Sequence, residues 1–231
     1  MIEEKNSQLE IGFVEQNTAL ESMRASDFDC YSAYGEIIDN SIQAHATDIR
    51  IEFNEREDRS ARSKKIGRIL FADNGDGMDK EILHTCLKLG KSSRYNDRSG
   101  IGRFGVGMTL GAIHECRRVE VYSKVNGGIW YYTYLDLDEI ENGTLTRMPF
   151  PVQKDPKFDI IDYIEDSGTL VIWTKYDKQI EPYETVIEET KIWLGRTFRK
   201  FLWGEAKGYE EIDITINNIK IKAIDPLYFN K

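Results

Sequence analysis

The segment GEIIDNSIQAHA, residues 35–46, places three polar side chains on one face of a predicted helix. Glu36, Asp39 and Asn40 are spaced i, i+3 and i+4, so they are neighbours on a helix, with the apolar residues of the segment on the other side. An amphipathic helix with a solvated polar face is the simplest interpretation. The alternative is chemical, because a carboxylate can take a proton from water and a carboxamide oxygen one turn later can bind Mg²⁺.

A second motif, ADNGDGMD at residues 72–79, follows a strand-like run. Asp73 is expected at the end of that strand, and Gly75 and Gly77 are expected to make a turn that no side chain obstructs. Asp-Asn-Gly is common in ordinary polar turns, which is the simpler interpretation. The functional interpretation makes Asp73 a buried acceptor for an exocyclic amine. A flat ring would then lie against the glycine backbone, with Met78 packed on it.

A third motif, GIGRFGVG at residues 100–107, matches the spacing G-x-G-x-x-G. The dinucleotide-binding form of this motif needs a preceding strand, and KSSRYNDRS at residues 91–99 cannot be a buried parallel strand. A kinase glycine loop is excluded too, since the other kinase signatures do not follow. We therefore predict a flexible lid whose last glycines open a helix at Met108, with backbone amides facing a phosphate. Arg103 and the other lid cations are either solvated charges or phosphate contacts.

Local patterns predict helices and strands without strict βαβ alternation, which favours an α+β fold with a mixed sheet. Asn217 and Asn218 are expected to close a C-terminal hairpin. Helices are predicted at 15–45 with a break near 26–29, at 78–89, at 108–118 and at 184–203. Strands are predicted at 49–54, 66–73, 118–125, 128–137, 168–175, 212–216 and 219–224.

In this order and spacing, the motifs resemble those of the GHKL ATPase superfamily. Its members include gyrase B, the ninety-kilodalton heat-shock chaperone, sensor histidine kinases, the MutL mismatch-repair proteins and the microrchidia-type ATPases. EIIDN is similar to the box with the catalytic Glu and the magnesium Asn, and DNGDGM to the adenine-pocket box. GRFGVG looks like the chaperone's lid motif, whereas DNGDGM with a serine-containing lid looks more like the microrchidia and MutL branches. GTLVIW, residues 168–173, resembles the late Gly-Thr motif that completes the adenine pocket.

The resemblance implies a Bergerat-type α+β sandwich: a mixed, mostly antiparallel sheet backed by helices, with ATP between the helix layer and a flexible lid. By analogy, Glu36 is the general base and Asn40 is the Mg²⁺ ligand. Asp73 then receives the adenine amino group, and Thr169 supports it. The other nucleotide contacts that the resemblance implies are Gly75, Gly77, Met78, Gly102, Arg103, Phe104, Gly105, Val106 and Gly107.

Composition limits the cellular compartments and the partners that are expected for this chain. It has 231 residues, of which 40% are hydrophobic, and a formal net charge of −9. No apolar run approaches the roughly 18 residues of a membrane span, and the N-terminus lacks the features of a secretory signal. The three cysteines and three histidines are scattered without disulfide or metal-ligand spacing, so a reduced, cytoplasmic protein with no membrane partner is expected. The acidic balance argues against sequence-independent DNA binding by this segment.

Two domains are predicted. Residues 1–205 are assigned to the ATP-binding domain, and residues 206–231 to the start of a following, transducer-like domain. Gyrase, MutL and chaperone relatives take a catalytic cation from the domain after the ATPase module. The chain is therefore expected to be a truncated N-terminal fragment with weak activity in isolation.

The leading hypothesis is a Mg²⁺-dependent ATPase module that acts as a conformational switch. ATP closes the lid, closure promotes homodimerisation or docking of the next domain, and hydrolysis resets the module. A nucleotide-sensing interaction module with little turnover is the first alternative. A histidine-kinase catalytic domain is the less favoured one, because that branch normally lacks the general-base Glu. DNA or a protein client, engaged through further domains, is compatible with the leading hypothesis, and the sequence does not identify the process served.

Overall fold

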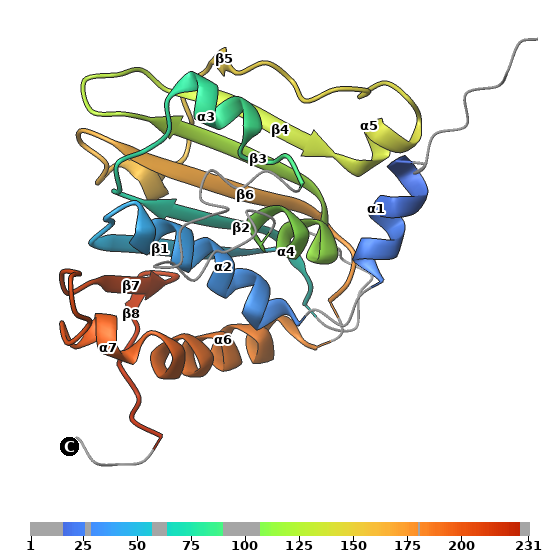
Figure 1. Ribbon diagram of the computed structural model, residues 1–231. Helices are drawn as coiled ribbons and strands as arrows, with labels where there is room; N and C mark the ends of the chain where they lie inside the picture. Colours follow the sequence, from blue (N-terminus) through green and yellow to red (C-terminus); the bar gives the residue numbers. More distant parts are fainter. Residues whose placement is uncertain (1–15, 26–28, 57–63, 90–106, 180, 227–231) are drawn as a thin grey trace, which may run out of the picture.

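A mixed β-sheet positions the predicted site residues. The computed structural model describes residues 16–25, 29–56, 64–89, 107–179 and 181–226, and in these residues eight strands form one sheet with the order β5-β4-β3-β6-β2-β1-β7-β8 (Figure 1). Neighbouring strands are antiparallel except β1 and β7, which are parallel. The strands are β1 (Asp48–Glu55), β2 (Ile66–Asp73), β3 (Cys116–Lys124), β4 (Tyr131–Asp136), β5 (Val152–Gln153), β6 (Gly168–Tyr176), β7 (Asp213–Ile216) and β8 (Ile219–Lys220).

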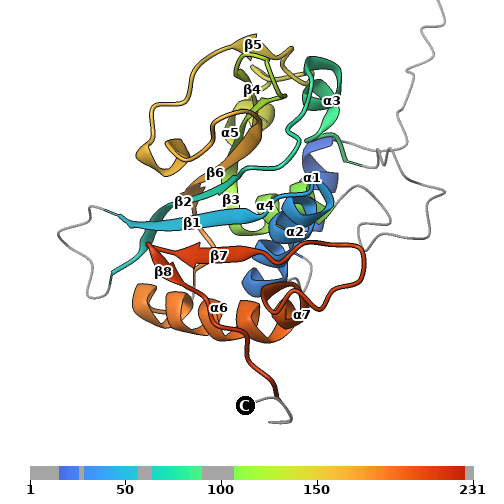
Figure 2. The same ribbon diagram turned by 90° about the vertical axis from the view of Figure 1, so that its left-hand side faces the viewer.

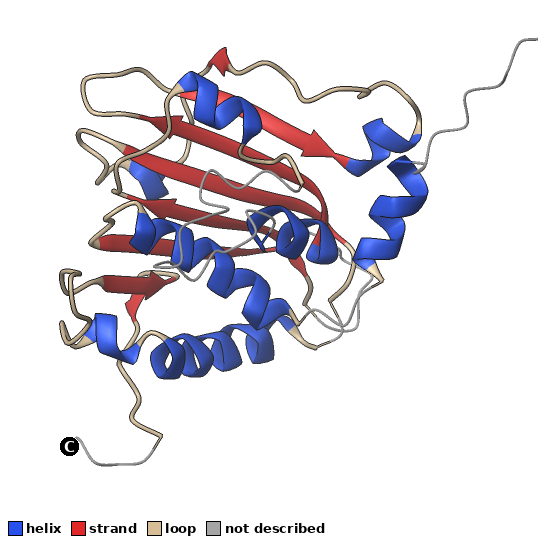
Figure 3. Ribbon diagram, in the orientation of Figure 1, coloured by secondary structure: helices blue, strands red, loops and turns tan. Residues whose placement is uncertain are grey.

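Helices cover one face of this sheet, and Figure 2 shows α2 and α4 together on that side. The distribution of helices and strands agrees with the predicted α+β class (Figure 3). The helices are α1 (Gln16–Arg24), α2 (Cys30–Gln43), α3 (Lys80–Thr85), α4 (Gly107–Glu115), α5 (Leu137–Glu141), the short 3₁₀ helix η1 (Asp159–Ile161), α6 (Tyr183–Thr197) and α7 (Arg199–Leu202). The described helices include none that is long and apolar enough to cross a bilayer.

The apolar stripe of α2 packs against the centre of the sheet. Ile38 and Tyr34 are fully buried, and the Tyr34 ring lies 5.7 Å from the ring of Trp173 and 6.0 Å from that of Phe71. Burial of each such aliphatic or aromatic side chain stabilises the fold by about 1.5–3 kcal/mol. The predicted stripe is thus confirmed as the inner face of α2, which leaves Glu36, Asp39 and Asn40 on the outer side.

The opposite face of the sheet is covered by the segment around η1. Ile160 and Ile164 pack there with Leu170 and Ile172 of β6 and with Leu70 of β2. β2 and β6 therefore contribute buried residues to both faces, as their nearly continuous apolar sequences suggest. Because both faces of these two strands are covered, polar side chains that could contact a ligand are expected at the strand ends.

Strand register brings three separate segments together at one end of the sheet. Asp73, the last residue of β2, pairs with Thr169 of β6, and Thr169 pairs with Ser123 of β3. The Asp73 and Thr169 motifs, almost a hundred positions apart in the chain, are thus neighbours in space. The C-terminal hairpin also forms as predicted, because Asn217 and Asn218 take the left-handed conformation that a tight two-residue turn requires.

Two predicted helices end earlier than their sequence patterns indicated, and the helix predicted at 184–203 is divided at Phe198 into α6 and α7. The helix predicted at 78–89 is α3, which ends at Thr85; its continuation is a turn in which Lys88 N–H donates to Thr85 O, and this turn still buries Leu87. The helix predicted at 108–118 is α4, which ends at Glu115. The next residues form β3, which starts at Cys116 and pairs with β4 and β6. In both places, hydrophobic spacing suited a helix but tertiary packing selected another backbone.

The segment after α7 joins the same sheet through β7, which pairs in parallel with β1 from Asp48 to Ile51. Ile224 N–H also donates to Gly195 O of α6. The assignment of residues 206–231 to a following domain remains a prediction, and these contacts show how that segment is attached to the sheet and to α6.

Candidate nucleotide site

Helix α2 presents the first group of predicted residues. Its N-terminus is capped by Asp29, whose side chain accepts a hydrogen bond from Ser32 N–H at 2.9 Å. Glu36 and Asp39 are half-buried on the outer side of the helix, and Asn40 is exposed. Burial raises the pKa of Glu36, and burial together with the charge of Glu36 raises the pKa of Asp39 to about 6. A carboxyl group whose pKa moves toward neutrality is a better proton acceptor for water.

Asp73 is buried where the end of β2 meets α2. Its side chain is 7% exposed. One carboxylate oxygen accepts a hydrogen bond from Ser41 Oγ at 2.9 Å, and the other accepts one from Gly75 N–H at 3.0 Å. Burial raises the pKa of Asp73 to about 6, although these two hydrogen bonds oppose the shift. An oriented, desolvated carboxylate of this kind suits recognition of an amine, because each oxygen retains acceptor capacity.

The turn after Asp73 depends on glycine at position 77. Gly77 has φ of +71°, and a Cβ atom built there would lie 1.9 Å from Lys124 O. Both the left-handed backbone and the close approach of β3 therefore exclude a side chain. Asp76 N–H donates to Ala44 O at 2.7 Å, which fixes the turn to the end of α2.

Thr169 and Met78 are linked through a serine that the sequence motifs do not include. Ser123 Oγ lies 2.9 Å from Thr169 Oγ1, accepts a hydrogen bond from Met78 N–H at 2.8 Å and donates to Gly168 O at 3.1 Å. This serine is fully buried. It thus connects the glycine turn with the Thr169 strand end. Met78 itself is half-buried, with its side chain packed against the main core.

Glu36 lies against the first residue of α4. A Cβ atom built on Gly107 would fall 1.8 Å from Glu36 Oε2, so any larger residue would displace this carboxylate. The N-terminus of a helix favours a negative charge nearby. The structure therefore brings the last glycine of the GIGRFGVG motif together with the predicted general base. Five other residues predicted to contact nucleotide lie outside the described residues: Gly102, Arg103, Phe104, Gly105 and Val106.

Most of the predicted site residues that the structure describes therefore lie around the outer side of α2 and the neighbouring ends of β2 and β6. They are Glu36, Asp73, Gly75, Gly77, Met78, Gly107 and Thr169. Ser41 and Ser123 are functional candidates that the motif analysis missed. Ser41 follows Asn40 directly in the chain, so its position within EIIDNS was an available signal. Ser123 had no signal, because only the pairing of β3 with β6 places it here.

The oxygen ligands available for a metal are few. The described residues contain no cluster of three or more His, Cys, Asp or Glu side chains that could hold a metal ion. The exposed amide of Asn40 offers one hard oxygen donor. That fits Mg²⁺, which usually keeps several waters and binds through one or two protein ligands and substrate phosphates. The residues present are thus suited to a metal that arrives with a nucleotide.

Comparison with protein families shows which family has this arrangement of residues. The family model described as Histidine kinase-, DNA gyrase B-, and HSP90-like ATPase matches residues 29–167, more than half of the chain. The chain belongs to this ATPase family. The matched range holds α2, the Asp73 turn and Gly107, so an ATP-binding domain of the GHKL type is confirmed, as is the predicted α+β fold with a mixed sheet.

Individual relatives belong to the microrchidia branch. Protein MICRORCHIDIA 7 of Arabidopsis thaliana is 23% identical over 217 residues, which cover 84% of this chain and 29% of the relative. Protein MICRORCHIDIA 1 of the same plant is 23% identical over 212 residues, covering 84% and 32%. ATPase MORC2B of Mus musculus is 36% identical over 95 residues, covering 41% of this chain and 9% of the relative. The chain spans less than a third of the length of these relatives, and the predicted resemblance to the microrchidia-type branch is confirmed.

The Gly77 turn can be tested against a matched glycine. Gly127 has nearly the same φ, +69°, but an added Cβ would meet nothing within 4 Å. Gly127→Ala is therefore expected to cost only the left-handed strain of about 1–2 kcal/mol. Gly77→Ala is expected to lower the free energy of unfolding by clearly more, because backbone atoms of β3 must also move. Urea unfolding of both variants measures the difference, and equal costs would show that the contact with β3 is unimportant.

The raised pKa of Asp73 predicts a pH dependence of stability. Its pKa is 3.8 in an ordinary environment and about 6 in the native protein. The native state therefore binds the proton more tightly than the unfolded state does. The stabilisation that this tighter proton binding gives to the native state is fully present below about pH 4 and is lost as the pH rises through 6. Asp39 contributes with the same sign, so the comparison of the parent with Asp73→Asn, by urea unfolding from pH 4 to 7.5, isolates Asp73. Parallel pH profiles would contradict the assignment.

Proposed function

We propose that this chain is a Mg²⁺-dependent ATP-hydrolysing module that acts as a conformational switch for further domains. The observation that carries the proposal is the convergence of Glu36, Asp73 and Gly107 within a domain of an ATPase family. Asp73 receives the adenine amino group in a pocket completed by Gly75, Gly77, Met78 and Thr169. The phosphates then extend along α2 toward Asn40, Glu36 and the start of α4.

Hydrolysis on this arrangement requires a proton acceptor beside the terminal phosphate. Glu36 takes a proton from the attacking water as the water oxygen bonds to the γ-phosphorus and the bond to the ADP oxygen breaks. Mg²⁺, when bound with the nucleotide, supplies neutralisation of phosphate charge, and Asn40 is the residue that would hold it. Glycine at position 107 leaves room for the Glu36 carboxylate at the helix N-terminus. The lid contacts proposed for Gly102, Arg103, Phe104, Gly105 and Val106 complete the phosphate site.

The switch is proposed to act through this same junction. Gly107, the last residue of the glycine-rich motif, begins α4, and α4 packs against α2, which carries Glu36. A change at the phosphates therefore has a direct physical route to α4 and to the core. Homodimerisation, a DNA or protein client and the contribution of residues 206–231 to a following domain belong to the same proposal.

A steady-state assay of phosphate release tests the proposal against the nucleotide-sensing alternative. With ATP and Mg²⁺, the chain is expected to release phosphate slowly but well above the rate without Mg²⁺, because a cation from a following domain is expected to be needed for full activity. Tight ATP binding by calorimetry with no release of phosphate above background would favour a sensing module.

Asn40→Ala is expected to remove the Mg²⁺ dependence of nucleotide binding. Mg²⁺ uses few protein ligands, so the loss of one oxygen donor removes most of what the protein contributes. Calorimetric titrations of ATP with Mg²⁺ and with EDTA measure this dependence in parent and variant. Asn40→Asp, which keeps an oxygen at the same place, is expected to retain it. If Asn40→Ala shows the same difference between the two titrations as the parent, another group holds the metal.

A further inference from the structure

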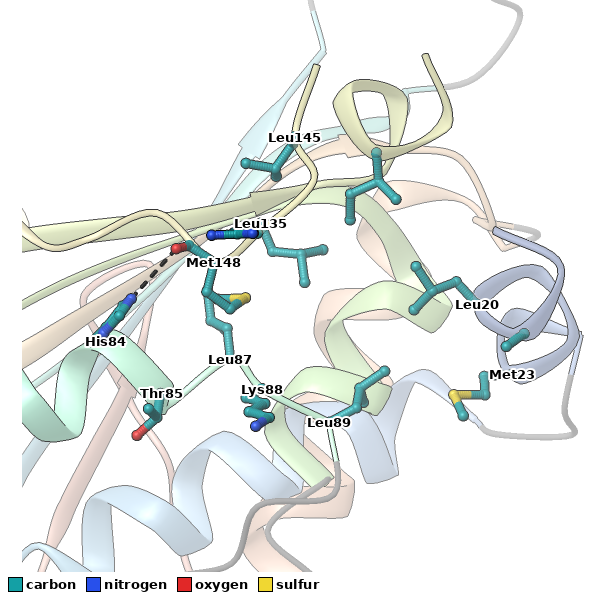
Figure 4. A pocket seen from close by; sticks show the side chains of 13 residues that line it. Leu20, Met23, His84, Thr85, Leu87, Lys88, Leu89, Leu135, Leu145 and Met148 are labelled. Carbon is teal, nitrogen blue, oxygen red and sulfur yellow. Dashed lines mark hydrogen bonds between the residues drawn. The ribbon is translucent and has the colours of Figure 1, made fainter. Parts of the chain in front are cut away.

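A second cavity lies apart from the nucleotide site. It has a volume of about 740 Å³ and lies between α1, the turn after α3 and the region of β4 and α5 (Figure 4). None of the described residues assigned above to the nucleotide site lines it. Figure 4 shows Leu20 and Met23 reaching it from α1, and Leu135 and Met148 from the opposite side. Its walls thus come from segments far apart in the sequence.

The lining of this cavity combines apolar walls with cationic groups. Leu20, Leu135 and Met148 are among nine aliphatic or thioether side chains in it, and the two charged residues are Lys88 and Arg147. Both are cations, although the whole chain carries a net charge of −9. Within the described part of the chain, neither has a carboxylate within ion-pair distance. Among the described residues, these two side chains are therefore the cations of the lining that a bound anion could contact.

Size and shape favour a small molecule as the occupant. Ligand pockets in proteins are typically concavities of about 300–1,000 Å³ with mostly apolar linings and a few polar groups that orient the ligand. The volume of about 740 Å³ fits that range. Met23 is 41% exposed at the rim, so the cavity is open to solvent on the α1 side.

We propose that this cavity is a ligand site for a molecule with an apolar chain and a terminal carboxylate, such as a medium-chain fatty acid. The chain lies against Leu20, Leu135 and Met148, where burial of apolar surface drives binding. The carboxylate lies beside Lys88 and Arg147, which remain hydrated and act by charge. This site is separate from the ATPase proposal and does not depend on it.

The methionines of the chain allow a test that separates the two sites. The protein is labelled with ¹³C in its methionine methyl groups and titrated with decanoate, followed by two-dimensional NMR. Met23 and Met148 line the cavity, whereas Met78 belongs to the predicted adenine pocket. Decanoate is expected to shift the Met23 and Met148 signals and to leave Met78 in place. Absence of shifts at Met23 and Met148, or a shift of Met78 at the same ligand concentration, would overturn the proposal.

Charge specificity is tested with an uncharged ligand of the same chain length. Decan-1-ol replaces decanoate, and the double variant Lys88→Gln/Arg147→Gln replaces the parent. Exposed ion pairs are individually weak, so the double change is expected to weaken decanoate about tenfold and to leave decanol within about twofold. Both changed side chains are exposed, so the fold is expected to be retained. Equal weakening of both ligands, or no weakening of decanoate, would contradict the proposed role of the cations.

Discussion

Glu36→Gln is expected to leave ATP affinity within a few-fold of the parent and to remove turnover. The amide has the same shape as the carboxylate but cannot take a proton from water, and loss of a general base typically lowers the rate by about 10²–10⁴-fold. The half-buried position of Glu36 raises its pKa, which suits this role, and its carboxylate lies against Gly107 at the start of α4. Phosphate release and calorimetry on the same preparations measure the two effects separately.

Asp39→Asn is the matched control, because Asp39 is also a half-buried carboxylate on the outer side of α2. It is expected to retain most of the turnover. If Glu36 were only a solvated surface residue, Glu36→Gln would leave hydrolysis unchanged, and stability would change by less than about 0.5 kcal/mol. A Glu36→Gln protein that hydrolyses ATP at the parent rate would remove the proposed mechanism.

Asp73→Asn is expected to weaken ATP binding about 10–100-fold. A hydrogen bond to a charged, buried group is worth roughly 1.5–3 kcal/mol, and the asparagine side chain would in addition present its own donors to the adenine amine. GTP is expected to bind the parent poorly, since guanine carries a carbonyl where adenine carries the amine. Calorimetry with both nucleotides tests this specificity.

Ser41→Ala is a milder change at the same site and is compared with Asp73→Asn. Ser41 donates to one Asp73 oxygen, so its loss leaves the carboxylate in place but less well oriented. It is expected to weaken ATP by less than Asp73→Asn does. Equal affinity of the parent for ATP and GTP would contradict the adenine pocket, whatever the two variants show.

The sequence predicted those parts of the site that are determined by residues close together in the chain. The spacing of Glu36 and Asn40 on one helix, the end of a strand at Asp73 and the tight turn at Asn217–Asn218 each follow from a few neighbouring residues, and the structure has all three. The fold class could also be predicted, because the apolar stripe of α2 and the apolar patterns of the strands reflect which residues are buried. Such features depend on periodicity and turn chemistry, which a single sequence displays.

The remaining parts depend on contacts between distant segments. Ser123 reaches the Asp73 region only through the register of β3 with β6, and the approach of Glu36 to Gly107 requires α2 and α4 to pack together. The early end of α3 has the same origin, since the turn that follows it already buries Leu87. No local pattern specifies such register or packing, so Ser123 and the contact between Glu36 and Gly107 were missed, and the residues after Thr85 were placed in a helix.

The central claim is that ATP binds with its adenine on Asp73 and its phosphates beside Glu36 and Asn40. A crystal structure of the chain with Mg²⁺ and a non-hydrolysable ATP analogue tests it most directly. The expected result places the adenine amino group within hydrogen-bond distance of the Asp73 carboxylate, Mg²⁺ on the Asn40 oxygen and the γ-phosphate nearest Glu36. A nucleotide bound with its base away from Asp73, or in the cavity lined by Met23 and Met148, would contradict the account.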